Sequence, residues 1–231
     1  MHKTIGILGG MSPESTAEYY LHLTRTYTAR HGDHGYPRIL VYSVSFQQYV
    51  EWMNAGQWDS IVSGLGAGAT VLQAAGADVI IIATNTMHIV YEQVQAAVSV
   101  PVLSLLDAVG AAITAQGLTT VGLLGTAFTM EQPFYREALA RQGITVLVPD
   151  AVDRAYVHRV VFEELIAGQV RAESRAGYER IIEGLAARGA GGIILGCTEI
   201  PLLIRAEDTG LPLFDTTRIH AEAALDFAVE D

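Results

Sequence analysis

TIGILG at residues 4–9 and TVGLLG at residues 120–125 are two versions of one short segment. Each is an apolar run that ends in glycine, which predicts a buried strand followed by a tight turn. The segments that follow repeat in the same order. Apolar runs occur at 38–44 and 144–148, GADVIIIATNT at 76–86 matches GAGGIILGCTE at 189–199, and Pro101 and Pro212 each precede a last apolar segment. The matching segments occur in the same order in both parts of the chain and lie 111 to 116 residues apart (101 to 212, 4 to 120). This regular offset indicates an internal duplication.

Helical patterns lie between these strands, for example from Pro13, which suits a first helical turn, and from Trp58 to Ala75. Strands that alternate with helices predict parallel sheets covered on both faces. The predicted fold is therefore α/β, with two pseudo-symmetric halves that each carry a four-stranded parallel sheet flanked by helices. Residues 1–106 plus 214–231 form the first predicted half and 107–213 the second, and the apolar run 100–106 is taken as the first half's fourth strand.

Composition limits the classes of function. The 231 residues are 50% hydrophobic and carry a net charge of −11, which suits a compact core and disfavours nucleic acid or anionic membranes as partners. The one cysteine, Cys197, excludes a disulfide framework or a cysteine-cluster metal site. We find no signal peptide and no apolar stretch of membrane-spanning length, so we expect a cytoplasmic protein.

Polar turns follow the strands of both halves. Ligands of open parallel sheets bind beyond the carboxyl ends of the strands. The sequence places Gly9–Ser12 and Thr84–Thr86 there in the first half, and Thr126–Thr129 and Cys197–Glu199 in the second. The duplication makes Thr84 and Cys197 equivalent positions, so we expect an active site in the cleft between the halves, with these two residues facing each other. Backbone N–H groups near a helix start would receive a carboxylate.

The same segments resemble the aspartate/glutamate racemase family. GILGGMSPEST at 6–16, ATNTMH at 83–88, LLGTAFTMEQPFY at 123–135 and GCTEI at 196–200 carry this resemblance from end to end of the chain. It implies a cofactor-independent amino-acid racemase, a homodimer that acts on L- and D-aspartate or glutamate without pyridoxal phosphate. Cys197 matches the second of the family's two catalytic cysteines, the one that removes the α-proton of the L-enantiomer. Thr84 stands where the first cysteine would be, and with FDTTRIHAE at 214–222 this resembles the L-aspartate/glutamate-specific subgroup.

The Cys/Thr asymmetry has a kinetic consequence. A cysteine can become a thiolate at neutral pH, whereas a threonine hydroxyl is a poor general base. We therefore expect a slow racemase in which an L-substrate exchanges its α-proton faster than it inverts, with the second proton coming from Thr84 or a water it holds. We also expect the Cys197 pKa to be lowered by nearby backbone dipoles.

We expect residues next to Thr84 and Cys197, and those of the two glycine-ended turns, to bind the substrate. Asn85 and Thr86, with Thr198, would donate hydrogen bonds to the substrate α-carboxylate and to the enolate-like charge that develops on it. Glu199 would pair with the substrate ammonium. Met11, Ser12, Thr126 and Thr129 would line the two glycine-ended turns. Arg154 matches only loosely a position at which related proteins often carry a basic residue for the distal carboxylate.

Other conspicuous residues have structural interpretations. His158 and His220 are taken as structural, and His88 as structural or a catalytic helper in equal measure. Gly64, Gly66 and Gly68 predict close helix packing, because they precede a strand and lack the dinucleotide-binding pattern. Glu163 and Glu164 are taken as a solvated helix face. No metal-ligand spacing is apparent.

Two other functions stay open. A decarboxylase of the arylmalonate type would also need a single cysteine, because it protonates one face only. A non-catalytic protein that binds a dicarboxylate could share the same polar turns.

Overall fold

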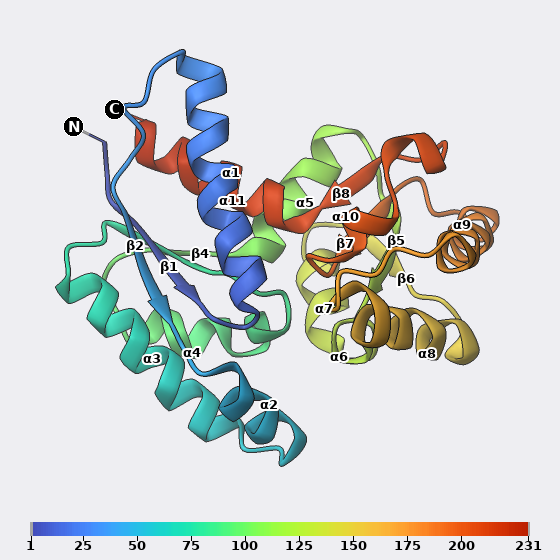
Figure 1. Ribbon diagram of the computed structural model, residues 1–231, viewed down its shortest axis with the longest axis horizontal. Helices are drawn as coiled ribbons and strands as arrows, with labels where there is room; N and C mark the ends of the chain where they lie inside the picture. Colours follow the sequence, from blue (N-terminus) through green and yellow to red (C-terminus); the bar gives the residue numbers. More distant parts are fainter. Residues whose placement is uncertain (1, 231) are drawn as a thin grey trace. The chain divides into compact units, whose positions relative to one another are not determined.

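The computed structural model describes residues 2–230, and within them the chain forms two units that repeat one strand order (Figure 1). Among the described residues, one unit comprises 2–105 and 217–230, the other 106–216. Each has a four-stranded parallel sheet, in the order β2-β1-β3-β4 in the first and β6-β5-β7-β8 in the second. The predicted α/β fold with two duplicated four-stranded sheets is confirmed.

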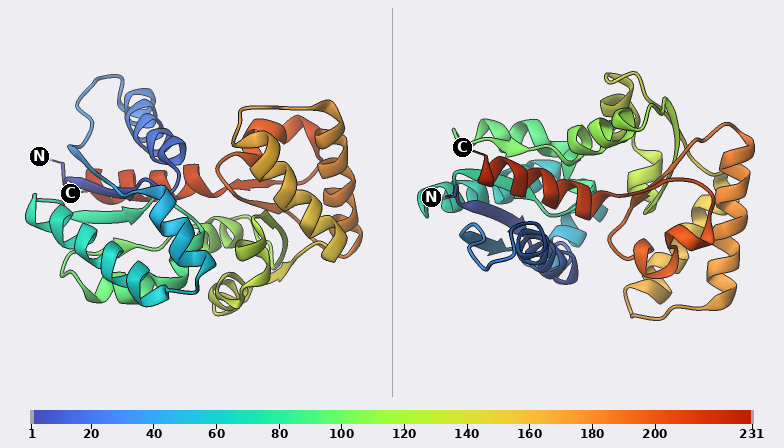
Figure 2. Two further views of the ribbon diagram at one scale, coloured as in Figure 1. Left: turned by 60° about the horizontal axis from the view of Figure 1, so that its bottom comes forward. Right: turned by 90° about the horizontal axis from the view of Figure 1, so that it is seen from above.

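The first sheet is built from four strands, β1 (Ile5–Gly9), β2 (Ile39–Ser43), β3 (Val79–Ile82) and β4 (Val102–Leu103). Its helical segments are α1 (Pro13–His31), α2 (Phe46–Asn54), α3 (Trp58–Ala74), the 3₁₀ segment η1 (Thr86–Val90), α4 (Tyr91–Ala96) and α11 (Thr216–Val229). Alternate residues of β1 and β3 face two cores. Leu8 and Ile80 pack with α3 and α4, whereas Ile7 and Ile81 pack with α1 and α11. Both views of Figure 2 show α11 running beside α1, and Arg30 of α1 pairs there with Asp226 at 2.5 Å.

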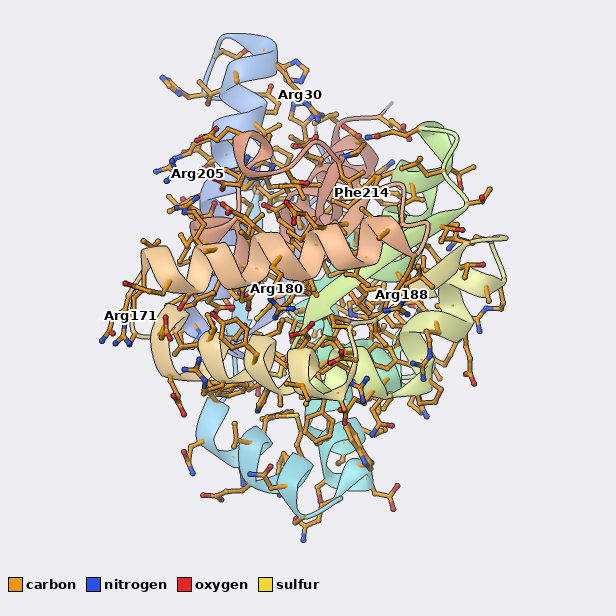
Figure 3. All side chains as sticks on the ribbon, turned by 90° about the vertical axis from the view of Figure 1, so that its right-hand side faces the viewer. Arg30, Arg171, Arg180, Arg188, Arg205 and Phe214 are labelled. Atoms are coloured by element: carbon orange, nitrogen blue, oxygen red, sulfur yellow. The ribbon has the colours of Figure 1, made fainter. Side chains whose placement is uncertain are left out.

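The second sheet comprises β5 (Thr120–Gly125), β6 (Thr145–Leu147), β7 (Ile193–Gly196) and β8 (Leu213–Asp215). Its helical segments are α5 (Leu105–Ala115), α6 (Ala127–Glu131), α7 (Pro133–Ala140), α8 (Ala151–Val160), the π-helical η2 (Val161–Leu165), α9 (Ala172–Ala187), α10 (Ile200–Leu203) and η3 (Ala206–Asp208). Figure 3 looks onto α9, where Arg180 lies on the side of α8 and pairs with Asp153 at 2.5 Å.

The glycines of α3 fit helix packing as predicted. A Cβ on Gly68 would lie 2.7 Å from Leu8 Cδ1 and 2.8 Å from Tyr42 Cδ1, and one on Gly64 would lie 2.4 Å from the Tyr49 hydroxyl. Real Cβ atoms do not approach so closely. The missing side chains therefore let α3 lie against the first sheet and α2.

Two predicted boundaries need correction. The apolar run 100–106 forms strand only at Val102–Leu103, and α5 begins at Leu105. An apolar run alone does not separate a buried strand from a buried helix, and Pro101 brings no N–H to the sheet. The sequence analysis places residues 214 and 215 in the first half, but they belong to β8, where Phe214 pairs with Ile194 of β7. The chain rejoins the first unit at Thr217.

Candidate active site

The first polar turn follows β1 and is built around Gly10. Gly10 has φ +95, and a Cβ there would lie 2.5 Å from the backbone N and O of Val44. Its N–H donates to Thr16 Oγ1 at 2.8 Å, and the next residues, Met11 and Ser12, are both buried. Ser12 caps α1 by accepting from the Ser15 N–H at 3.2 Å. The turn is thus fixed to the beginning of α1.

The second polar turn follows β3, next to β1. Leu8 pairs with Ile82 in the sheet, so the residues after both strands leave the same edge. Ser15 Oγ donates to the Ala83 carbonyl at 3.3 Å, which ties α1 to this turn. Thr84 is partly exposed, Asn85 is buried, and Thr86 begins η1. The five predicted first-half residues, Met11, Ser12, Thr84, Asn85 and Thr86, therefore lie at one sheet edge.

His88 lies just beyond this turn and has a structural environment. Its Nδ1 is 2.8 Å from the Thr84 carbonyl oxygen, and its Nε2 accepts from the Leu105 N–H at 2.9 Å. Burial lowers the pKa of His88 to about 4. His220 is also buried, with Nδ1 2.9 Å from Tyr19 Oη and Nε2 3.0 Å from the Leu103 carbonyl, and burial lowers its pKa to about 3. Both rings are neutral at physiological pH.

In the second unit, the turn after β5 contains Thr126 and Thr129. Thr126 caps α6, with its Oγ1 3.5 Å from the Thr129 N and 3.2 Å from Thr129 Oγ1. Thr129 is buried against Gly125. The Ala127 N–H donates to His158 Nδ1 at 3.2 Å, so α8 supports this turn and His158 has the structural contact expected of it.

Cys197 follows β7 at the same edge, because Gly125 pairs with Gly196 in the sheet. Its thiol donates to Glu199 Oε2 with 2.9 Å between Sγ and Oε2, and the Thr198 hydroxyl donates to the same oxygen at 2.8 Å. Cys197 as a whole residue is partly exposed to solvent. The second-half residues Thr126, Thr129, Cys197, Thr198 and Glu199 therefore gather around two neighbouring strand ends, as the first-half residues do.

The predicted lowering of the Cys197 pKa is wrong. Burial of the thiol and the negative charge of Glu199 raise the Cys197 pKa well above its ordinary value, and its hydrogen bond to Glu199 adds to this. Backbone hydrogen bonds act in the predicted direction but are outweighed. The carboxylate two residues away and the burial of the thiol account for the difference. The resting cysteine is thus a thiol next to a carboxylate that can accept its proton.

Two further side chains, Arg154 and Glu164, have contacts that the sequence does not predict. Arg154 is held by Glu131, with 3.1 Å between Nε and Oε1, and by the Pro149 carbonyl at 2.9 Å. Glu164 is not part of a solvated face. It is 3% exposed, accepts from Ser174 Oγ at 2.5 Å and pairs with Arg159 at 3.3 Å, whereas Glu163 is exposed. Glu164 lies in the π-helical segment η2, where its contacts with Ser174 and Arg159 satisfy the buried carboxylate.

Between residues 2 and 230, no group of three or more His, Cys, Asp or Glu side chains is placed to hold a metal ion. Across that part of the chain, no helix has the length and apolarity needed to cross a bilayer.

Comparison with known proteins supplies the family. The model of the Asp/Glu/hydantoin racemase family matches residues 8–224. A crystal structure from Yersinia pestis, provisionally assigned as an Asp/Glu racemase, is 44% identical over 99% of this chain and all of its own, with a TM-score of 0.94. An aspartate racemase homologue from Pyrococcus horikoshii OT3 is 36% identical over the full length of both chains, with a TM-score of 0.90. The broad specificity amino-acid racemase RacX of Bacillus subtilis is 25% identical over 96% of each chain.

These matches cover nearly the whole chain, including both sets of strand-end residues. The names of all three refer to racemases, and the two crystal structures share the fold of this chain over its whole length. The chain therefore belongs to the Asp/Glu/hydantoin racemase family and is an isomerase.

Proposed function

We propose that the protein interconverts L- and D-aspartate or glutamate without a cofactor, with Cys197 acting on one face of the substrate α-carbon and Thr84 on the other. The observation that carries this proposal is the thiol–carboxylate pair of Cys197 and Glu199 at the end of β7, with 2.9 Å between Sγ and Oε2. A thiol that touches a proton acceptor has the means to become the thiolate that the reaction needs.

In the proposed reaction, every proton that leaves one group is taken up by another. The Cys197 proton moves to Glu199, and the thiolate then removes the α-proton of the L-substrate. The electron pair of the broken C–H bond spreads into the substrate carboxylate, where Asn85, Thr86 and Thr198 are proposed to donate hydrogen bonds. A proton from the Thr84 hydroxyl, or from water bound to it, then reaches the other face of the α-carbon. Solvent restores that proton, and the Cys197–Glu199 pair releases its extra one.

Substrate binding would itself favour the thiolate. The charge of Glu199 helps to keep Cys197 protonated in the free protein. A substrate ammonium placed beside Glu199, as the sequence predicts for this residue, would offset that charge and lower the Cys197 pKa. In this proposal, the charged form of Glu199 first pairs with the substrate ammonium. It then accepts the Cys197 proton, which ends that charge pairing.

The range of side chains accepted is a separate part of the proposal. Arg154, the candidate for the distal carboxylate, already pairs with Glu131. RacX, a relative over nearly its full length, is named for broad specificity. We therefore expect neutral amino acids to be turned over as well as aspartate and glutamate.

The test is turnover of a panel of L- and D-amino acids followed by chiral chromatography, with the wild-type protein and Cys197→Ala side by side. The proposal predicts inversion by the wild type, and none by the variant. Carbon dioxide release from an arylmalonate without amino-acid inversion would instead identify a decarboxylase. Ligand binding without turnover by either protein would identify a binding protein.

A further inference from the structure

His88 uses both nitrogens of its ring on the backbone of the first unit. Nε2 lies 2.9 Å from the Leu105 nitrogen, whose N–H can only donate, so Nε2 accepts. The ring proton is therefore on Nδ1, which donates to the Thr84 carbonyl at 2.8 Å. One neutral tautomer satisfies both contacts, and a proton added at Nε2 would break the bond to Leu105.

This arrangement argues against His88 as an acid or base. The side chain is buried at 4% exposure, and burial lowers its pKa to about 4. To exchange a proton with a substrate, the ring would have to give up one of its two backbone partners. What the ring does in this structure is join two backbone segments.

The segments that His88 joins are the Thr84 turn and the end of the first unit. Leu105 is the last residue before the chain enters the second unit, and β4 just before it is only two residues long. Other side chains hold this stretch as well. Tyr91 Oη donates to the Val102 carbonyl at 2.8 Å, and His220 Nε2 donates to the Leu103 carbonyl at 3.0 Å. The stretch is thus a fixed support against which His88 can hold Thr84.

We propose that His88 is a positioning residue that holds the Thr84 backbone, and through it the Thr84 hydroxyl, where the second proton transfer takes place. This inference rests on the proposed function, and it assigns His88 to the Thr84 side of the reaction alone. A threonine hydroxyl is a weak proton donor, so its position relative to the α-carbon should matter. A displacement of a reacting group by about 1 Å can lower the rate about a hundredfold. The Cys197 step, on a different unit, does not depend on this contact.

Two substitutions separate the two contacts of His88. In His88→Gln, the amide lies near the position of Nε2, so an acceptor for Leu105 is kept and the donor to Thr84 is lost. In His88→Asn, the amide lies near Nδ1, so the donor to Thr84 is kept and the acceptor for Leu105 is lost. The readout is the ratio of α-proton exchange to inversion for an L-substrate in D₂O, because general damage to the fold lowers both rates and leaves their ratio unchanged.

We expect His88→Gln to raise this ratio by about tenfold or more, and His88→Asn to leave it within about threefold of the wild type. Tyr91→Phe is the matched control. It removes a partly buried hydrogen bond to Val102 in the same backbone stretch but leaves both backbone contacts of His88 in place. It is therefore expected to lower stability without changing the ratio. An unchanged ratio in His88→Gln, with exchange intact, would overturn the inference about His88 alone. Absence of exchange in the wild type would overturn the proposed function instead.

A measurement on the wild-type protein covers the case in which His88→Gln does not fold. Nitrogen NMR of ¹⁵N-histidine-labelled protein should show His88 protonated at Nδ1 only, both free and with substrate, and without titration between pH 5 and 9. A ring protonated at Nε2 in the substrate complex would contradict the inference, because that ring would have released Leu105 to take part in proton transfer.

Discussion

The thiol of Cys197 donates a hydrogen bond to the carboxylate of Glu199, with 2.9 Å between Sγ and Oε2. Burial, the charge of Glu199 and this contact together raise the Cys197 pKa, so the cysteine is a thiol at rest. In the proposed mechanism, the same carboxylate accepts the thiol proton. Because the charge of Glu199 helps to raise the Cys197 pKa, a substitution that removes this charge should change the titration of the thiol.

Glu199→Gln tests this coupling. Removing the negative charge should lower the Cys197 pKa, because that charge helps to raise it, while racemisation should fall at least about tenfold because the proton acceptor is lost. The rate of alkylation by iodoacetamide against pH measures the thiol directly, since the chain has one cysteine. Glu222→Gln, a surface substitution in the first unit, is the control. A higher midpoint pH for alkylation of Glu199→Gln would contradict the account.

Thr84→Cys tests the other side of the reaction. A thiol at this position is a much better acid and base than a hydroxyl, so we expect faster inversion and an exchange-to-inversion ratio closer to one. Thr84→Ala should change the ratio in the opposite sense. Proton NMR in D₂O together with chiral chromatography gives both rates. Equal ratios in all three proteins would show that Thr84 has no part in reprotonation.

Arg154→Gln tests the substrate range. Because Arg154 already pairs with Glu131 and the pair is partly exposed, its loss should cost little stability, within about 1 kcal/mol. We expect the ratio of kcat/KM for aspartate to that for alanine to change by less than about threefold. A tenfold loss confined to aspartate and glutamate would identify Arg154 as the partner of the distal carboxylate and would refute this expectation.

The buried histidines predict a dependence of stability on pH. His88 and His220 have folded-state pKa values of about 4 and about 3, below the ordinary value of 6.5, so the unfolded chain binds more protons in between. Their contribution to stability is present above pH 6.5 and is lost as the pH falls toward these values. Each should contribute a slope of up to about 1.4 kcal/mol per pH unit in that window. Urea unfolding of the wild type and His88→Gln between pH 4 and 7 checks this, and the variant should show the shallower slope.

The sequence predicts the fold and the strand-end residues well, for a physical reason. Buried parallel strands such as 120–125 and the glycines after them leave a strong local pattern, and the duplication lets each half support the interpretation of the other. What depends on contacts between side chains is not visible in that pattern. The raised pKa of Cys197, the pairing of buried Glu164 with Ser174 and Arg159, and the pairing of Arg154 with Glu131 all belong to this class.

The short strand β4 shows that prediction from local sequence has the same limit for the backbone. Residues 100–106 are apolar enough for a strand or a helix, and the sequence analysis takes the whole run as a strand, whereas only Val102–Leu103 form one. In the structure, side chains from outside the run hold it, as when His88 accepts from Leu105 where α5 begins. The residues that hold the run lie outside it in the sequence, so the run itself does not predict these contacts.

The most direct test of the central claim follows the α-proton of an L-substrate in D₂O. Proton NMR gives its loss and chiral chromatography gives inversion, for the wild type and Cys197→Ala under the same conditions. The account predicts that the wild type loses the α-signal faster than it inverts the substrate and that Cys197→Ala does neither. Exchange at the wild-type rate in Cys197→Ala, or exchange in the wild type that is no faster than inversion, would contradict it.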